Sequence, residues 1–420
     1  MTKRARDDSA SRTESAPPSA GQCSAQPDAS NTAHAGDDAP TTSSTAPSQT
    51  CAKPTAQTTQ STQSDDAVPA LLAMTRANPP TALWNDSADP DELAAAISWG
   101  AVGATANPVI ALAAIRARQE RWTTRIAQLA EQMPTASESA IGWKVIEEVS
   151  IQAAKLLEPA FAAHRGIDGR LSVQTDPRLA RDAKALADQA AHFSGLAPNI
   201  VVKIPATSVG LVAIEEATYR GVSVNVTVSF TAAQAVAAGE AIERGLKRRE
   251  AEGFDTANMG PVVTIMVGRL DDWIREVVNR ERIALNPGFL EWCGVAVFKN
   301  AYRVFQEKGL RARLLSAAFR SILHLTEFVG GKVVVSPPFA WQVMINDNAL
   351  QLPARIDVPV EPAILGTLLA IPEFRRAYDP QGMVPAEFDT FGATRKTLRQ
   401  FLDADAQLDA LVRDVLIPAP

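Results

Sequence analysis

Eight short apolar runs, separated by stretches with helical spacing, constrain the fold of this chain more than any other feature. They span residues 82–85, 102–105, 170–175, 200–204, 222–228, 262–267, 312–316 and 332–336. Strands that alternate with helices predict a parallel sheet with right-handed crossovers. Eight of them favour a single closed (β/α)8 barrel, the TIM-barrel architecture. An open doubly wound sheet is the alternative, although no glycine-rich dinucleotide fingerprint follows any of these runs.

Two segments are too long to be simple crossovers between these strands. Residues 108–165 follow the second run, and we expect one or two helices there. Residues 345–420 follow the eighth run and begin with a proline-containing connection. Near their end, Leu398, Phe401 and Leu408 recur at roughly helical spacing, which predicts helices that pack on the barrel. The barrel and this extension are expected to occupy residues 76–420.

The N-terminal part of the chain has a composition that does not favour folding. Residues 1–67 contain no Val, Leu, Ile, Phe, Trp or Tyr. Such a segment buries too little apolar surface to offset the entropy lost on ordering, so we predict that residues 1–75 are a disordered arm. Neither a secretory signal nor a transit peptide is expected, because no apolar core follows residues 1–8 and acidic residues appear at once. No apolar segment is long enough to span a bilayer, so we expect a cytoplasmic protein.

Charge and the metal-binding residue types argue against further classes of function. Nucleic-acid binding needs a basic surface, whereas the net charge here is -6. The one basic cluster, residues 244–249, is bracketed by Glu243 and Glu250, as expected for a solvated helix face. The cysteines and histidines show no metal-ligand spacing, and His324 is expected to be a packed or solvent-tipped side chain. We therefore predict no metal, no cofactor, no nucleic acid and no membrane partner.

One lysine lies at the end of an apolar run, where an ammonium group is costly to bury. Residues 200–202 are typical of a buried strand, and Pro205 limits how far the strand continues beyond Lys203. Two interpretations are open. The side chain either extends to the edge of the sheet and keeps its charge in water, or desolvation lowers its pKa and frees a neutral amine to attack a carbonyl.

Polar residues stand at the carboxyl ends of most of the predicted strands. They are Asp86, Asn107, Gln174, Lys203, Asn225 with Thr227, Arg269 and Arg320. Several have a structural explanation of their own. Asp86 and Asn107 could cap helices, Asn225 could satisfy backbone groups, and Arg269 could pair with Asp271 or Asp272 on the surface. In a β/α barrel, however, all these positions meet on the rim where active sites lie, which favours a functional site.

As a group, these side chains have a consistent chemistry. A lysine amine forms a Schiff base with a ketone, which allows an adjacent carbon–carbon bond to break. The carboxylate of Asp86 can remove the hydroxyl proton that drives this cleavage. The amides of Asn107 and Asn225 can hold sugar hydroxyls. Two arginines can clamp a phosphate, and Arg320 follows the seventh strand, close to the usual phosphate site of such barrels.

Seven short motifs carry a family resemblance over roughly residues 80 to 340. They are Trp84-Asn-Asp86-Ser, Gly103-Ala-Thr-Ala-Asn107-Pro108, Gly169-Arg-Leu-Ser-Val-Gln-Thr-Asp176, Val202-Lys203-Ile-Pro-Ala-Thr207, Val224-Asn225-Val-Thr227, Val267-Gly268-Arg269 and Ala317-Ala318-Phe319-Arg320. In this order they resemble the transaldolase family of class I, Schiff-base aldolases. The Thr-x-Asn-Pro and Lys-Ile-Pro-Ala-Thr elements are specific when they occur together.

The resemblance implies a role for each residue of the rim. Lys203 would form the Schiff base, and Asp86 would accept the proton of the substrate's C4 hydroxyl. Asn107 and Asn225 would bind the dihydroxyacetone moiety, and Arg269 and Arg320 the phosphate. The implied reaction moves a dihydroxyacetone unit from a ketose phosphate to an aldose phosphate, as in the non-oxidative pentose phosphate pathway. The oligomeric state is left open, with a homodimer among the alternatives.

Three positions depart from the pattern of the transaldolases. Gln174 stands where that family carries a glutamate that works with a threonine, here Thr227, through a catalytic water. Glutamine can position water but cannot shuttle a proton. Ala318 replaces a serine near the phosphate, and Met266 replaces an aromatic residue.

These departures keep two other functions open. Glutamine at position 174 resembles the fructose-6-phosphate aldolases, which release free dihydroxyacetone, although that branch is compact and carries a tyrosine in place of Met266. The loss of both the glutamate and the serine would also suit a barrel that binds sugar phosphates without turnover.

Overall fold

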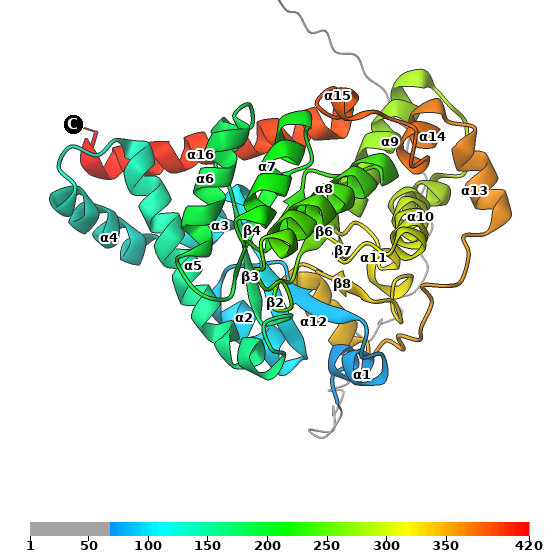
Figure 1. Cartoon of the computed structure of the whole chain (residues 1–420), viewed down its shortest axis with the longest axis horizontal. Helices are drawn as coiled ribbons and strands as arrows, with labels where there is room; N and C mark the ends of the chain where they lie inside the picture. Colours follow the sequence, from blue (N-terminus) through cyan, green and yellow to red (C-terminus); the bar gives the residue numbers. More distant parts are fainter. Residues whose placement is uncertain (1–67, 420) are drawn as a thin grey trace, which may run out of the picture. The chain divides into compact units, whose positions relative to one another are not determined.

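The computed structural model describes residues 68–419 and contains a closed barrel of eight parallel strands (Figure 1). The strands are β1 (Ala82–Asn85), β2 (Ala101–Thr105), β3 (Arg170–Gln174), β4 (Ile200–Pro205), β5 (Val224–Thr227), β6 (Val262–Ile265), β7 (Arg313–Ser316) and β8 (Val333–Val335). Each pairs with its neighbour in the sequence, and β8 returns to β1. All eight apolar runs form strands, so the prediction of a (β/α)8 barrel is confirmed.

Helices connect and follow the strands. They are α1 (Ala70–Ala77), α2 (Pro90–Ser98), α3 (Pro108–Ala117), α4 (Gln119–Gln132), α5 (Glu138–Ala163), α6 (Ala183–Ser194), α7 (Ser208–Tyr219), α8 (Ala232–Ala251), α9 (Val267–Glu281), α10 (Cys293–Lys308), α11 (Leu323–Thr326), α12 (Phe339–Asp347), α13 (Pro362–Leu369), α14 (Pro372–Tyr378), α15 (Pro385–Phe388) and α16 (Gly392–Leu416), with short 3-10 helices η1 (Pro177–Leu179) and η2 (Pro287–Trp292). None of the helices in the described part of the chain combines the length and the apolar character that a bilayer crossing needs.

Two predictions about segment boundaries were wrong. The insertion after β2 forms three helices, not one or two, because α3 ends at Ala117 and Pro134 follows the end of α4. The proposed limit of the N-terminal arm, between residues 75 and 76, falls inside α1, where Leu71 and Met74 supply buried apolar side chains. Residues 1–67 lie outside the described part of the chain, so their predicted disorder stays a prediction.

A large apolar side chain fills the barrel below its carboxyl-end mouth. Trp84 of β1 is fully buried and packs in a cluster with Val201, Val262 and Val334 from other strands. On β2, a Cβ at Gly103 would lie 2.5 Å from the Trp84 indole, so only glycine leaves room for the ring. The indole and its neighbours therefore close the barrel interior and form a floor beneath the polar residues at the strand ends.

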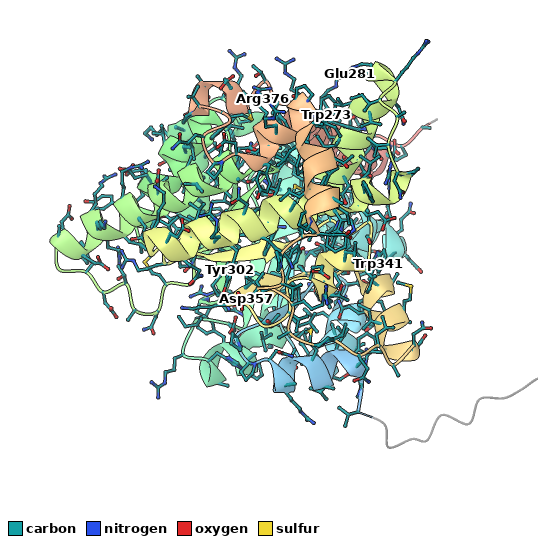
Figure 2. The ribbon with its side chains drawn as sticks, turned by 90° about the vertical axis from the view of Figure 1, so that its right-hand side faces the viewer. Trp273, Glu281, Tyr302, Trp341, Asp357 and Arg376 are labelled. Carbon is teal, nitrogen blue, oxygen red and sulfur yellow. The ribbon has the colours of Figure 1, made fainter. Side chains whose placement is uncertain are left out.

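The last helix crosses one end of the barrel. Helix α16 packs against α9, η1, α3, α5 and α4, and it runs across the top of the view in Figure 1. The first residue of α16, Gly392, packs closely against α9, because a Cβ there would lie 2.0 Å from the ring of Trp273. Trp273 Nε1 donates to Glu373 on α14, and Arg376 of α14 pairs with the same carboxylate (Figure 2). The predicted packing of the C-terminal helices on the barrel is confirmed.

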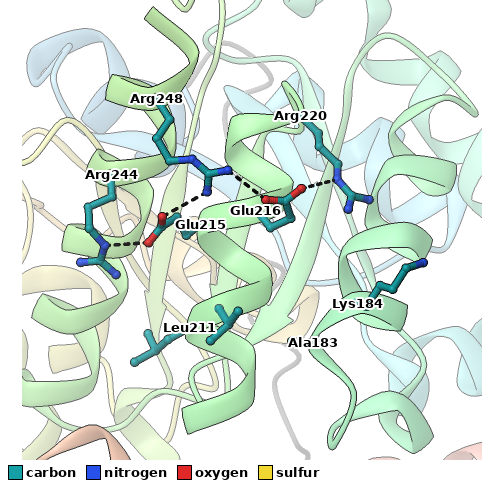
Figure 3. Close-up of a pocket in the computed structure, with 9 residues that line it drawn as sticks. Ala183, Lys184, Leu211, Glu215, Glu216, Arg220, Arg244 and Arg248 are labelled. Carbon is teal, nitrogen blue, oxygen red and sulfur yellow. Dashed lines mark hydrogen bonds and ion pairs between the residues drawn. The ribbon is translucent and has the colours of Figure 1, made fainter. Parts of the chain in front are cut away.

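The basic cluster predicted as a solvated helix face lies on α8 and faces acidic residues of α7. Arg244 pairs with Glu215 at 2.7 Å, and Arg248 bridges Glu215 and Glu216 (Figure 3). Both arginine side chains stay about half exposed. The prediction of a solvated helix face is therefore confirmed, although the flanking Glu243 and Glu250 pair with Arg311 and the cluster is balanced by α7.

Candidate active site

The strand-end residues of β3, β4 and β5 lie side by side. In the register of the sheet, Gln174 is opposite Lys203, and Lys203 is opposite Asn225. Thr227 follows two residues further along β5, opposite Pro205. Neighbouring residues in register point to the same face of a parallel sheet, so these side chains share one region of the barrel mouth.

Lys203 is a buried lysine whose amine is held by the backbone. Its side chain is only 5% exposed, and Nζ donates a hydrogen bond to the carbonyl oxygen of Ala106 at 3.0 Å. Burial lowers the pKa of Lys203 to about 8; the negative charge of Asp86 opposes this shift and the positive charge of Arg269 adds to it. The side chain does not extend into water, so of the two interpretations of this lysine the structure favours the desolvated amine.

Asp86 faces the lysine from the end of β1. Thr105 Oγ1 donates a hydrogen bond to Asp86 Oδ1, and Ser336 Oγ lies 3.2 Å from Thr105 Oγ1. Burial raises the pKa of Asp86, while the charge of Lys203, the bond from Thr105 and the charge of Arg269 act in the opposite direction. Among residues 68–419, Asp86 and Lys203 make no direct ion pair, and the cap of α2 is Asp89, not Asp86. The carboxylate of Asp86 therefore lies near the Lys203 amine, close enough for each charge to affect the pKa of the other group.

Three consecutive residues, at and just after the end of β2, include the hydrogen-bond partners of both Asp86 and Lys203. Thr105 binds the Asp86 carboxylate through its hydroxyl, and Ala106 binds the Lys203 amine through its carbonyl. Asn107 then caps α3, because its Oδ1 accepts from the backbone N–H groups of Val109 and Ile110. The capping interpretation of Asn107 is therefore correct as far as Oδ1 is concerned. Asn107 directly follows Ala106, whose carbonyl oxygen accepts from the Lys203 amine.

Asn225 is anchored by side chains, not by the backbone groups that the sequence suggested. Its Nδ2 donates to Ser172 Oγ at 2.9 Å, and its Oδ1 accepts from Thr264 Oγ1 at 2.8 Å. Sequence reasoning missed Thr105, Ser172 and Thr264 as site residues. A signal was available: each is a polar residue inside an apolar run, two positions or fewer from a strand end.

Gln174 lines the site with an amide that lacks one partner. The side chain is 5% exposed, and its Oε1 has no hydrogen-bond partner among the described residues. Gln174 lines a small pocket together with Asn107 and Trp143. Thr227 is 2% exposed at the end of β5. An amide at position 174 accepts and donates hydrogen bonds but carries no titrating proton.

The two arginines approach the mouth from the first turn of α9, which follows β6, and from the loop after β7. Arg269 Nη1 donates to Thr397 Oγ1 at 3.0 Å and to Gln400 Oε1 at 2.5 Å, and its guanidinium lies 5.6 Å from the Phe401 ring. Burial, and then the charge of Arg320, lower the pKa of Arg269. The suggested surface pair of Arg269 with Asp271 or Asp272 is absent from the described ion pairs. Its partners lie on α16, too far along the chain for sequence reasoning to find.

Arg320 pairs with the aspartate that had been considered for Arg269. Its Nε donates to Asp272 Oδ2 at 2.9 Å, and the side chain stays about half exposed. The loop that carries it has Ala318 in the left-handed region, with a φ of 62°. Gly268 lets the loop approach α9, because a Cβ there would lie 2.1 Å from the Ala318 carbonyl oxygen. Two guanidinium groups therefore flank the side of the mouth opposite β2–β3.

Comparison with protein families agrees with this geometry. Residues 83–363 match the family described as Transaldolase/Fructose-6-phosphate aldolase. The matched segment contains all eight strands except the first residue of β1, and all eight candidate residues of the rim. The chain belongs to the transaldolase/fructose-6-phosphate aldolase family.

Curated relatives carry the name transaldolase. Transaldolase 1 of Streptomyces coelicolor is 31% identical over 273 residues, which cover 64% of this chain and 67% of the relative. A transaldolase of Arthrobacter sp. is 28% identical over 313 residues, 74% of this chain and 78% of the relative. Transaldolase 1 of Streptomyces avermitilis is 38% identical, over 176 residues that cover 41% of this chain and 46% of that relative. The chain thus spans less than half of the length of this last relative.

Within this transaldolase-type barrel, the three unusual positions lie at the mouth. Gln174 stands beside Lys203, Met266 precedes α9, and Ala318 lies in the loop of Arg320. Ala318 contributes no hydroxyl to that loop, and Met266 is 5% exposed and packs in the apolar core. The remaining rim residues supply the amine, the carboxylate and the guanidinium groups that the proposed chemistry uses.

Proposed function

We propose that this protein is a transaldolase that transfers a dihydroxyacetone unit between sugar phosphates through a Schiff base on Lys203. The observation that carries this proposal is the buried amine. Its pKa of about 8 leaves about one lysine in ten neutral at pH 7, against about one in several thousand for an ordinary lysine. The bond to Ala106 O holds this amine beside the Asp86 carboxylate.

The proposed reaction starts at the carbonyl of a ketose phosphate. The neutral Nζ of Lys203 attacks C2, water leaves, and an iminium ion forms. Asp86 then takes the proton of the C4 hydroxyl, the bond between C3 and C4 breaks, and the aldose phosphate departs. The electron pair of the broken bond remains on the three-carbon enamine. An incoming aldose phosphate accepts that pair at its carbonyl carbon, and hydrolysis of the new iminium ion returns the free amine. The raised pKa of Asp86 suits a group that first accepts and later returns a proton.

The arginines are proposed to bind the substrate phosphate. Arg269 and Arg320 are close enough for each other's charge to matter, since Arg320 lowers the pKa of Arg269. A phosphate dianion between them would relieve this repulsion and accept paired hydrogen bonds. We propose sedoheptulose 7-phosphate and fructose 6-phosphate as donors, which would place the enzyme in the non-oxidative pentose phosphate pathway. Asn225 and Asn107 are proposed to hold the hydroxyls of the dihydroxyacetone unit.

One assay distinguishes this function from its nearest alternative. The purified full-length protein is given fructose 6-phosphate with and without erythrose 4-phosphate, and both sedoheptulose 7-phosphate and free dihydroxyacetone are measured. Strict dependence on the aldose acceptor supports a transaldolase. Release of dihydroxyacetone without acceptor would instead support an aldolase-type lyase, the alternative that the neutral Gln174 motivates.

The same assay tests the non-catalytic alternative. A barrel that only binds sugar phosphates would show no turnover with either mixture. Steady turnover that disappears in Asp86→Ala would contradict that alternative, because loss of one carboxylate should not affect an activity contributed by a contaminant. A matched control is Asp89→Ala, which removes the cap of α2 three residues away and leaves the rim unchanged.

A further inference from the structure

A buried histidine and a buried aspartate lie directly behind the loop of Arg320. His324 on α11 is 0% exposed and Asp271 on α9 is 1% exposed at the side chain. The His324 Nε2 and Asp271 Oδ2 atoms are 2.8 Å apart. On the other side of the ring, His324 Nδ1 accepts a hydrogen bond from the backbone N–H of Arg320 at 3.0 Å. Neither residue belongs to the rim that carries the proposed chemistry.

These contacts fix the tautomer of the histidine. Because Nδ1 accepts from a backbone N–H, it holds no proton, and the ring proton must lie on Nε2. Nε2–H then donates to Asp271, whose other oxygen accepts from the backbone N–H of Gly294 at 2.7 Å. Both oxygens of the carboxylate are therefore acceptors, and no other arrangement of protons satisfies all four groups.

The loop that carries Arg320 contains a strained residue, and His324 contacts this loop. Ala318 adopts a left-handed conformation, which is unfavourable for a residue with a Cβ. The Phe319 ring packs edge-on against the His324 ring, with centroids 5.8 Å apart. The carbonyl of His324 also accepts from Ser316 Oγ at the end of β7. The histidine thus ties the strand, the strained turn and the backbone of Arg320 together.

We propose that His324, oriented by Asp271, is a positioning residue that holds the backbone of Arg320 where its guanidinium can bind the phosphate of the substrate. This inference rests on the proposed function for the identity of the phosphate compound. Two adjacent residues of α9 support different parts of Arg320, since Asp272 binds the guanidinium and Asp271 acts on the backbone through the imidazole. His324 touches neither substrate nor reacting atoms, so its effect should fall on phosphate affinity.

Three substitutions test this arrangement. His324→Leu removes the acceptor for the Arg320 N–H. His324→Asn keeps an acceptor near the position of Nδ1 and should restore most of the function. Asp271→Asn retains the shape, but its amide must turn a donor toward either the imidazole or Gly294, so one of the two bonds is lost. The control is His192→Leu, which removes a more exposed histidine of α6 that pairs with Glu147 at 2.7 Å.

Two measurements on the full-length variants separate positioning from general damage. Calorimetric titration with fructose 6-phosphate reports phosphate-dependent affinity, and borohydride trapping of unphosphorylated dihydroxyacetone reports the reactivity of Lys203. We expect His324→Leu and Asp271→Asn to weaken fructose 6-phosphate binding by about tenfold, the effect of one lost hydrogen bond to a buried group. Trapping of dihydroxyacetone should be unchanged, and His324→Asn should bind within about threefold of the wild type. Nitrogen-15 spectra of the wild type should show Nδ1 unprotonated.

The outcomes keep this inference apart from the proposed function. Unchanged fructose 6-phosphate binding in folded His324→Leu and Asp271→Asn would overturn the positioning role, and so would an equal loss of affinity and trapping. If the wild type traps no dihydroxyacetone while the variants still lose sugar-phosphate affinity, the Schiff-base function fails and the positioning role stands. If His324→Leu does not fold, Asp271→Asn and His324→Asn decide the question, since both keep a polar side chain at the buried site.

Discussion

Burial of the Lys203 side chain stabilises neither the folded protein nor the ammonium form of the lysine. Among residues 68–419, the amine makes one hydrogen bond, to Ala106 O, and no ion pair with the nearby carboxylate of Asp86. Its lowered pKa means that the folded protein resists the ammonium form that dominates in water near neutral pH. The proposed reactivity accounts for such a lysine, because the same desolvation that destabilises the charge produces the nucleophilic amine.

We expect Lys203→Met to inactivate the protein and to stabilise it. The folded pKa is about 8 and the ordinary value 10.5, so wild type carries a penalty that is complete below pH 8 and disappears as pH rises to 10.5. Removal of the charge should raise the free energy of unfolding by about 2 kcal/mol at pH 7. Urea unfolding at pH 7 and pH 10 measures this difference, which should shrink at the higher pH. A less stable variant at pH 7 would mean that Lys203 is held by favourable interactions.

Gln174 gives the second prediction at this scale. Gln174→Glu adds a titrating carboxyl beside Lys203 and should raise the rate of transfer to erythrose 4-phosphate by about tenfold or more, as proton shuttling typically contributes. Steady-state kinetics of the full-length variant measures the effect. Gln152→Glu on α5 is the control, since it makes the same chemical change away from the rim. An unchanged or lower rate would indicate that another group already carries the proton.

The sequence indicated the chemistry of the rim but not its supports. Lys203, Asp86 and Asn225 stand out because polar residues are rare at the ends of apolar runs. Thr105 and Thr264 have the same signal, yet threonine is so common in strands that the signal is easily discounted. The partners of Arg269 could not be found, because Thr397 lies 128 residues further along the chain and only the fold brings it near.

At the scale of elements, α16 connects two sides of the barrel mouth. Near its start it binds Arg269 through Thr397 and Gln400. In its later turns, Asp405 and Asp409 pair with Arg178 of η1, at 3.0 and 3.3 Å, and Arg178 also pairs with Asp176 at 2.8 Å. The Arg178 guanidinium therefore pairs with three carboxylates, so the contact between α16 and η1 has an excess of negative charge.

This excess charge predicts that Asp405→Asn strengthens the docking of α16. Burial, and then the charge of Asp176, raise the pKa of Asp405 to about 6 from 3.8. A raised carboxyl pKa favours the folded state only where the group is protonated, so wild type loses stability as pH rises from about 4 to 6. Relative to wild type, Asp405→Asn should gain about 1–2 kcal/mol of unfolding free energy at pH 8 and little at pH 4.

Urea unfolding at both pH values measures this gain, with the exposed Asp403→Asn on the same helix as control. Arg178→Gln should have the opposite effect at pH 8, because it leaves three carboxylates without their cation. A destabilised Asp405→Asn at pH 8 would show that its ion pair with Arg178 outweighs the burial of its charge.

At the scale of the whole molecule, the barrel was predictable because its strands are buried on both faces. Their residues are mostly apolar, their order along the chain matches their order in the sheet, and closure of β8 on β1 follows from the number of strands. The course of the helices was less predictable. The three helices after β2 are divided by local breaks at Arg118 and Pro134, and packing decides how they lie.

The reactivity of one lysine toward a ketone is the property on which the proposed function depends. Its most direct test is borohydride reduction of the full-length protein with fructose 6-phosphate, followed by peptide mass spectrometry. We expect one adduct, on the peptide that contains Lys203, formed about tenfold more slowly for each pH unit below 8. The peptide with Lys299, whose mostly buried amine is paired with Glu327, should stay unmodified. An adduct that persists in Lys203→Met, or no adduct in the wild type, would contradict the account.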